Sequence, residues 1–167
     1  MAHCAAVLAV STTCRGVELK NLRWRDVELG NRVVSIRRSK TDAGQRSIPL
    51  NADALSALVR LSGRAQAPGC SEPEYYVFPA CENGNIDPTT PQKSWRSAWR
   101  SLTSKAGMKG YRFHDLRHQA ITELAEGRAS DATIMTVAGH LDRQMRNTIA
   151  TLAWTPNDPH SENWRVG

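Results

Sequence analysis

Apolar residues recur at helical spacing along much of the chain, with polar and turn-forming residues between these segments. Leu55, Leu58 and Leu61, for example, lie three residues apart, which places them on one face of a helix. Ser130 and Asp131 are suited to cap the start of another helix, and Gly139 is suited to end it. The pattern predicts helices over residues 2–11, 52–61, 92–106 and 115–126, a helical turn or two over 15–22, and a last helix from residue 130 to 138.

Two short stretches are more typical of β-strands. Residues 33–36 are rich in β-branched side chains. Residues 46–50 resume a strand-like pattern after the turn. Residues 39–44 between them have the composition of a turn, so the two stretches predict an antiparallel hairpin. The expected fold is α+β, mainly helical, with a small antiparallel sheet near residues 31–50. The glycine- and proline-containing segments, residues 63–74 and 80–91, are predicted to be loops.

Composition and charge narrow the class of protein. The 167 residues are enough for one domain with a sizeable core, and 40% hydrophobic and 23% charged residues fit a soluble globular protein. The formal net charge of +6 favours an anionic partner such as nucleic acid. Trp24, Trp95 and Trp99 are expected in the core rather than as platforms for stacked bases.

Basic residues gather in one stretch, between Pro91 and His118, in which Asp115 is the only acidic residue. Such a cluster is often no more than a solvated helix face, but here it lies beside the candidate site described next and predicts a footprint on a phosphate backbone. The residues that we expect to contact DNA are Lys93, Arg96, Arg100, Lys105 and Arg112.

Other classes of protein are disfavoured. The four cysteines show no CxxC spacing, so we expect reduced thiols in a cytoplasmic protein. The apolar stretch at residues 5–10 is too short to span a membrane. His114 and His118 have a spacing that zinc ligands also use, but no third ligand is placed nearby, so we expect neither a metal nor another cofactor.

The chemistry centres on residues 114–118, His-Asp-Leu-Arg-His. His114 lies three residues before Arg117, so on a helix both side chains share one face. An imidazole beside a guanidinium is suited to hold a phosphate group.

Four motifs, in order, resemble those of the tyrosine recombinases, the phage integrase family. Residues 13–19 (Thr-Cys-Arg-Gly-Val-Glu-Leu) resemble the first conserved box, residues 39–41 (Ser-Lys-Thr) the lysine turn, residues 114–118 the second box and residues 138–140 (Ala-Gly-His) the start of the third. Each motif alone is weak, but the four together cover nearly all of residues 1–145.

The resemblance implies breakage of double-stranded DNA by a tyrosine that attacks a backbone phosphate, which leaves a phosphotyrosyl bond and a free 5′-hydroxyl without metal or ATP. Arg15 and Arg117 would bind the non-bridging oxygens. His114 and His140 would add hydrogen bonds and assist proton transfer, and Lys40 would protonate the leaving oxygen. Glu18 would support the arginines rather than act chemically.

The chain departs from the family where the nucleophile is expected. The family places its tyrosine about nine residues after the histidine of the third box, and this position is Ile149. The tyrosines of the chain are Tyr75, Tyr76 and Tyr111. The first two lie in an apolar run, and no family pattern makes Tyr111 a nucleophile. We therefore predict that the chain as given is inactive in strand cleavage.

The tail, residues 146–167, shows no helical periodicity. One DNA spelling of the family-like sequence Met-Leu-Glu-His-Tyr-Ser-His, with one base deleted, translates into the residues found from Met145 to Thr151. A frameshift after Met145 would thus explain the missing tyrosine. The alternatives are a natural DNA-binding or regulatory remnant of an integrase, and a nucleophile supplied by a neighbouring protomer.

The expected organisation is a catalytic domain over residues 1–145, followed by the atypical tail over 146–167. The core-binding domain that usually precedes the catalytic domain in the family is expected to be absent, which would make DNA binding weak and strongly dependent on salt. The resemblance also implies a homo-oligomer on DNA, which the altered tail would weaken.

Overall fold

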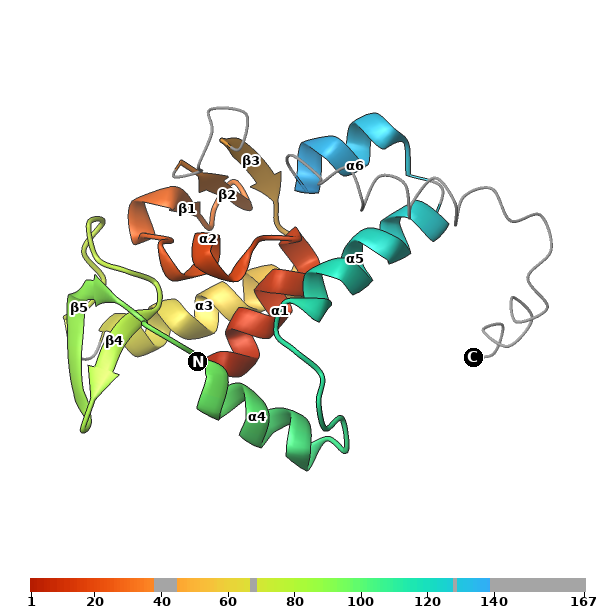
Figure 1. The fold of residues 1–167 in the computed structure, drawn as a ribbon. Coiled ribbons are helices and arrows are strands. Elements are labelled where there is room, and N and C mark those ends of the chain that lie inside the picture. The colour runs from red at the N-terminus through yellow and green to blue at the C-terminus, as the bar shows by residue number, and fades with distance from the viewer. Residues whose placement is uncertain (38–44, 67–68, 128, 139–167) are drawn as a thin grey trace.

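The structure, a computed structural model, describes residues 1–37, 45–66, 69–127 and 129–138. It confirms the α+β class, with helices dominant and the strands in small antiparallel sheets (Figure 1). The elements are α1 (Ala2–Thr12), α2 (Gly16–Lys20), a 3-10 turn η1 (Trp24–Asp26), β1 (Val27–Glu28), β2 (Val33–Ile36), β3 (Arg46–Pro49), α3 (Ala52–Gln66), β4 (Pro79–Glu82), β5 (Asn85–Pro91), α4 (Arg96–Lys105), α5 (Asp115–Glu126) and α6 (Asp131–Ala138).

Helix α1 is the centre of the fold. It contacts α2, α3, α4 and α5, and Figure 1 shows α3 and α5 lying against it. Its inward side chains are mostly small, with Cys4, Ala5, Leu8 and Ala9 all buried. Small side chains let neighbouring helices approach closely, so α1 can be surrounded by four helices and still fill the core.

The first sheet has the strand order β1-β2-β3, and all its pairs are antiparallel. Val34 pairs with Ile48 and Ile36 pairs with Arg46, so these four residues share one face. Val34, Ile36 and Ile48 are buried in the main core. The predicted hairpin is therefore confirmed, with one further short strand at its edge. The face that it buries also carries one arginine, Arg46.

A second sheet was not predicted. Residues 80–91 were expected to be a loop, but β4 and β5 pair there as an antiparallel hairpin. The turn at Asn83 and Gly84 has positive φ at both positions, 52° and 84°, which is the geometry of a tight two-residue hairpin turn. The prolines that argued against a strand are tolerated because each strand of a two-stranded sheet is an edge.

The helix predictions differ from the structure mainly at the ends. α5 has the predicted limits, and α6 begins at the predicted cap, where the backbone N–H of Thr133 donates to Ser130 Oγ at 3.1 Å. α3 continues to Gln66, through Gly63, so the start of the predicted 63–74 loop is helical. α4 begins at Arg96 instead of residue 92.

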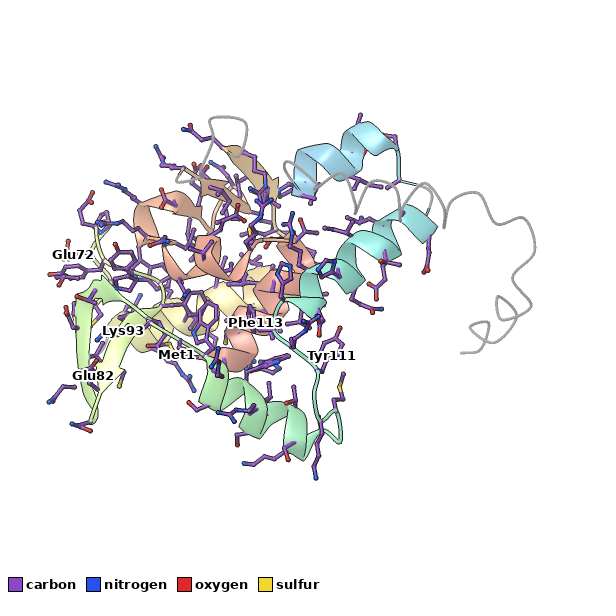
Figure 2. All side chains as sticks on the ribbon, viewed as in Figure 1. Met1, Glu72, Glu82, Lys93, Tyr111 and Phe113 are labelled. Atoms are coloured by element: carbon purple, nitrogen blue, oxygen red, sulfur yellow. The ribbon has the colours of Figure 1, made fainter. Side chains whose placement is uncertain are left out.

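An aromatic cluster connects α4 to the start of α5. Trp95 and Trp99 pack against Phe113, with ring centroids 5.0 and 5.3 Å away, and Phe78 packs against Trp95. Phe113 and Tyr111 lie on the segment between α4 and α5 (Figure 2). Trp95 and Trp99 are buried, and Trp24 packs against the core, so the tryptophans are core residues as predicted. The cluster holds the segment that leads directly into His114 and Arg117.

No helix of the described residues has both the length and the apolar character that crossing a membrane requires. The cysteines are free thiols, of which Cys4, Cys14 and Cys70 are buried and Cys81 is exposed.

We predict that Leu58→Ala lowers the free energy of unfolding by about 2–5 kcal/mol, because Leu58 is fully buried between α3 and the core and its truncation leaves a cavity. The matched control is Val59→Ala on the same helix, where the side chain is 53% exposed and the expected change is within about 0.5 kcal/mol. Denaturant unfolding measures both, and equal losses would contradict the packing described.

Candidate active site

Arg15 lies immediately before α2, in a local structure that its own sequence builds. Its backbone N–H donates to Glu18 Oε2 at 2.7 Å, and its guanidinium donates to Glu18 Oε1 at 3.1 Å. This reciprocal arrangement caps the start of α2, because the carboxylate of Glu18 accepts from the backbone N–H of Arg15, the residue that precedes the helix. The turn is short, so Arg15 and Glu18 are held close to each other with Arg15 partly exposed and Glu18 buried.

Glu18 is shared with a second arginine. Arg46, on β3, donates to both carboxylate oxygens at 3.2 and 3.0 Å, and the side chains of Arg46 and Glu18 are only 6% and 3% exposed. Burial alone would raise the pKa of this carboxyl. The hydrogen bonds and positive charges of Arg46 and Arg15 outweigh burial and hold the pKa of Glu18 below its ordinary value of 4.5. Glu18 is therefore ionised and bridges the two arginines.

Arg117 is the most buried cation of the site, with 3% of the residue exposed. From α5, its guanidinium donates to the backbone carbonyls of Thr13, at the end of α1, and of Ala138, at the end of α6, the latter at 2.9 Å. Burial and the positive charge of Arg15 lower the pKa of Arg117 to about 10. It therefore still carries its charge near pH 7, buried against neutral carbonyl groups.

Thr13 has an unusual backbone. Its φ is 53°, in the left-handed region, which a β-branched residue enters at a cost of about 1–3 kcal/mol. The surrounding contacts hold it there: its carbonyl accepts from Arg117, and its hydroxyl donates to Val137 O at 3.1 Å. This strained residue turns the chain from α1 toward Arg15, and it is tied to two other elements of the site.

His114 immediately precedes α5 and is exposed. Its ring contacts that of His118 edge to face, with centroids 4.7 Å apart. Burial, His118 and Arg117 all lower the pKa of His114 below its ordinary value of 6.5. The imidazole is thus neutral near pH 7 and able to donate one hydrogen bond and accept another.

The structure brings part of the predicted site together. Arg117 donates to the backbone carbonyl of Thr13, two residues before Arg15, and the positive charge of Arg15 contributes to lowering the pKa of Arg117. The positive charge of Arg117 in turn contributes to lowering the pKa of His114. Lys40, His140 and Ile149 lie outside the described residues. Sequence reasoning missed Arg46. Its strand position could have indicated it: Arg46 and Ile48 are two residues apart on the strand and face the same inward side, where a charge requires a buried partner.

The predicted DNA-contacting residues are all exposed, but their surroundings differ. Lys93 pairs with Glu82 on β4 at 3.0 Å, and Figure 2 labels both side chains. Arg112 pairs with Asp115 at 3.0 Å. Arg96, Arg100 and Lys105, all on α4, have no carboxylate partner within the described ranges 1–37, 45–66, 69–127 and 129–138.

A metal centre would need a cluster of suitable ligands. Across the part of the chain that the structure describes, no group of three or more His, Cys, Asp or Glu side chains is arranged to hold a metal ion. The chemistry available from these residues is that of guanidinium and imidazole groups, which bind anionic oxygens and exchange protons.

The sequence of this chain is similar to sequences of known proteins. The model of the phage integrase family matches residues 2–151 of this chain. Among curated proteins, the shufflon-specific DNA recombinase of Escherichia coli is 28% identical over 149 residues, which cover 88% of this chain and 34% of that protein. The integrase of Salmonella phage P22 is 24% identical over 152 residues, which cover 87% of this chain and 38% of that protein. The chain thus spans about a third of the length of these relatives.

Solved structures share the fold. The Tn1549 transposon integrase in complex with transposon right end DNA superposes with a TM-score of 0.70 at 21% identity, covering 88% of this chain and 53% of that one. The XerA recombinase superposes with a TM-score of 0.66 at 22% identity, covering 90% of this chain and 52% of that one.

We predict that Glu18→Gln lowers the free energy of unfolding by about 3–5 kcal/mol at neutral pH, because two arginines lose the charge that they share in a buried site. The pKa of Glu18 is lowered in the folded state, so its stabilisation is present above the ordinary value of 4.5 and is lost as the pH falls through the lowered value. The difference between the wild type and Glu18→Gln should therefore shrink in acid.

The matched control is Glu74→Gln, because Glu74 also binds two arginines, Arg23 and Arg25, but its side chain is 61% exposed. Its expected cost is within about 1 kcal/mol. Unfolding curves across acidic and neutral pH measure both variants. A Glu18→Gln cost that equals the control, or that does not change with pH, would contradict the buried bridge.

Proposed function

The chain belongs to the phage integrase family, and from this premise we propose that it is the catalytic domain of a site-specific DNA recombinase or integrase. It binds double-stranded DNA and holds a scissile phosphate in place for attack by a tyrosine. The position of that tyrosine is occupied by Ile149, so the chain as given binds without cutting. Because it spans about a third of its curated relatives, the activity of the whole protein is part of this proposal.

The observation that carries the proposal is the buried charge of Arg117. Its hydrogen bonds run to two carbonyl oxygens, which are neutral, and it lies near two more guanidinium groups, those of Arg15 and Arg46. Such a gathering of positive charge favours an anionic ligand. A guanidinium has more N–H groups than these two bonds use, so Arg117 can hold its carbonyl partners and a phosphate together.

The roles in the reaction follow from these groups. Arg15 and Arg117 bind the non-bridging oxygens, on which negative charge grows in the transition state. His114, neutral near pH 7, donates a hydrogen bond and relays a proton, and His140 assists. Lys40 gives a proton to the 5′-oxygen as the phosphorus–oxygen bond breaks. The attacking tyrosine oxygen would form the new bond to phosphorus, and this is the step that isoleucine cannot perform.

The remaining contacts to DNA come from the basic residues near α4. Arg96, Arg100 and Lys105 are exposed and have no carboxylate neighbour among the described residues, so they are best placed to replace counterions along the DNA backbone. Lys93 and Arg112 would exchange their present acidic partners for phosphates. We also propose that the protein acts in the cytoplasm and that the altered tail weakens its assembly into oligomers on DNA.

We predict that the chain binds a nicked suicide DNA substrate without forming a covalent adduct, because no tyrosine lies at the attacking position. Denaturing electrophoresis measures the adduct. The control is the same coding DNA with one base restored after the codon for Met145. Adducts from the restored protein alone would identify a damaged enzyme, and adducts from neither would favour the regulatory remnant. An adduct from the chain as given would contradict its inactivity.

We predict that Arg100→Gln weakens binding to duplex DNA and reduces the slope of log K against log salt by about 1, because one phosphate contact is lost. Arg25→Gln is the control, since Arg25 is also a surface arginine but is bound to Glu74 at 2.8 Å. Fluorescence anisotropy over a salt series measures both. Equal slopes for the two variants would contradict a footprint on α4.

A further inference from the structure

Among the described residues, three donors from other elements hold the last turn of α6. Val137 O accepts from the hydroxyl of Thr13 at 3.1 Å and from Arg46 Nε at 3.0 Å. Ala138 O accepts from Arg117 at 2.9 Å. The carbonyls at the end of a helix have no partner within it and carry partial negative charge, so two guanidinium groups at this point satisfy them and complement the helix dipole.

The described side chains of α6 also make apolar contacts. The helix has eight residues: Ile134 and Ala138 form a small cluster with Ile121, and Val137 packs against the main core. A helix of this length is marginal by itself in water. The polar contacts at its end, together with the packing of Val137, hold it against β3 and the end of α1, while the small apolar cluster joins it to α5.

Arg46 connects this helix end to the candidate site. One side of its guanidinium binds both oxygens of Glu18, and Glu18 binds Arg15. The Nε of the same side chain binds Val137 O. A planar guanidinium cannot turn one end without moving the other, so the helix end and the Glu18 carboxylate are held in one fixed geometry.

We propose that Arg46 is a positioning residue: it fixes the last turn of α6, which directly precedes the Gly139-His140 motif in the sequence, relative to Arg15 and Glu18. The meaning of this role for DNA chemistry rests on the function proposed above. The positioning role itself is defined by contacts among described residues and does not depend on that function.

A lysine at position 46 separates charge from geometry. Its ammonium group can remain beside Glu18 and preserve the charge balance, but it has no second donor group at the position of Nε. Arg46→Lys should therefore spare much of the overall stability while releasing α6.

The first experiment is backbone hydrogen exchange on the whole chain, in the wild type and in Arg46→Lys. We expect the amides of α6 to exchange about tenfold faster in the variant, with α1 and α3 unchanged, since one charged hydrogen bond to the helix end is lost. The matched control is Arg37→Lys, because Arg37 follows β2 of the same sheet and binds Asp26 at 2.8 Å. It should leave α6 unchanged. Unchanged exchange of α6 in Arg46→Lys, or an equal rise in all helices, would overturn the proposal.

A second variant covers the case in which Arg46→Lys does not fold. Thr13→Val removes the other donor to Val137 O and leaves Glu18 and its arginines intact. It should also speed exchange of α6. Where Arg46→Lys does fold, the effects of the two variants should be non-additive, because both act on one acceptor. No change in α6 exchange in Thr13→Val would overturn the proposal that these donors hold the helix end.

DNA affinity then distinguishes positioning from direct contact. If Arg46 touched a phosphate, lysine would preserve that contact, whereas a positioning role predicts about fivefold weaker binding of a short duplex at an unchanged salt slope. Equal DNA affinity of Arg46→Lys and the wild type would contradict the claim that Arg46 affects DNA binding through the candidate site. Failure of the wild type to bind DNA would refute the proposed function instead, and the exchange result would still decide the role of Arg46.

Discussion

The burial of the Arg117 guanidinium is the constraint around which the site is arranged. A charged group inside a protein must be bound by several partners, and here two of them are backbone carbonyls from different elements, Thr13 O and Ala138 O. The ends of α1 and α6 must therefore both reach the first turns of α5. Thr13 accepts a left-handed backbone to do so, which shows that the arrangement overrides local preference.

The electrostatics of the site follow from the same arrangement. Arg15, Arg46 and Arg117 lie near one ionised carboxylate, Glu18, and burial together with their mutual repulsion lowers the pKa of Arg117 to about 10. In the folded protein, the negative charge of Glu18 and the negative end of the α6 dipole offset this repulsion. Under the proposed function, a site prepared in this way would bind an incoming phosphate without having to reorganise, which is the basis of electrostatic catalysis.

Much of this could be predicted from sequence, and the exceptions have physical reasons. Periodicity predicted the helices, and the ordered motifs singled out Arg15, His114 and Arg117, which the structure places near one another. The β4–β5 hairpin was missed because its prolines were weighed above the Asn83-Gly84 turn signal. For Arg46, the strand position indicates only that it faces inward; its partners, Glu18 and Val137, lie far away in the chain, and no local pattern identifies them.

We propose that Arg15 and Arg117 bind one backbone phosphate while Arg117 keeps its bonds to Thr13 O and Ala138 O. A crystal structure of the chain with a short DNA duplex tests this most directly. We expect one phosphate within hydrogen-bond distance of both guanidinium groups. DNA bound elsewhere on the surface, with no phosphate near Arg117, would contradict it.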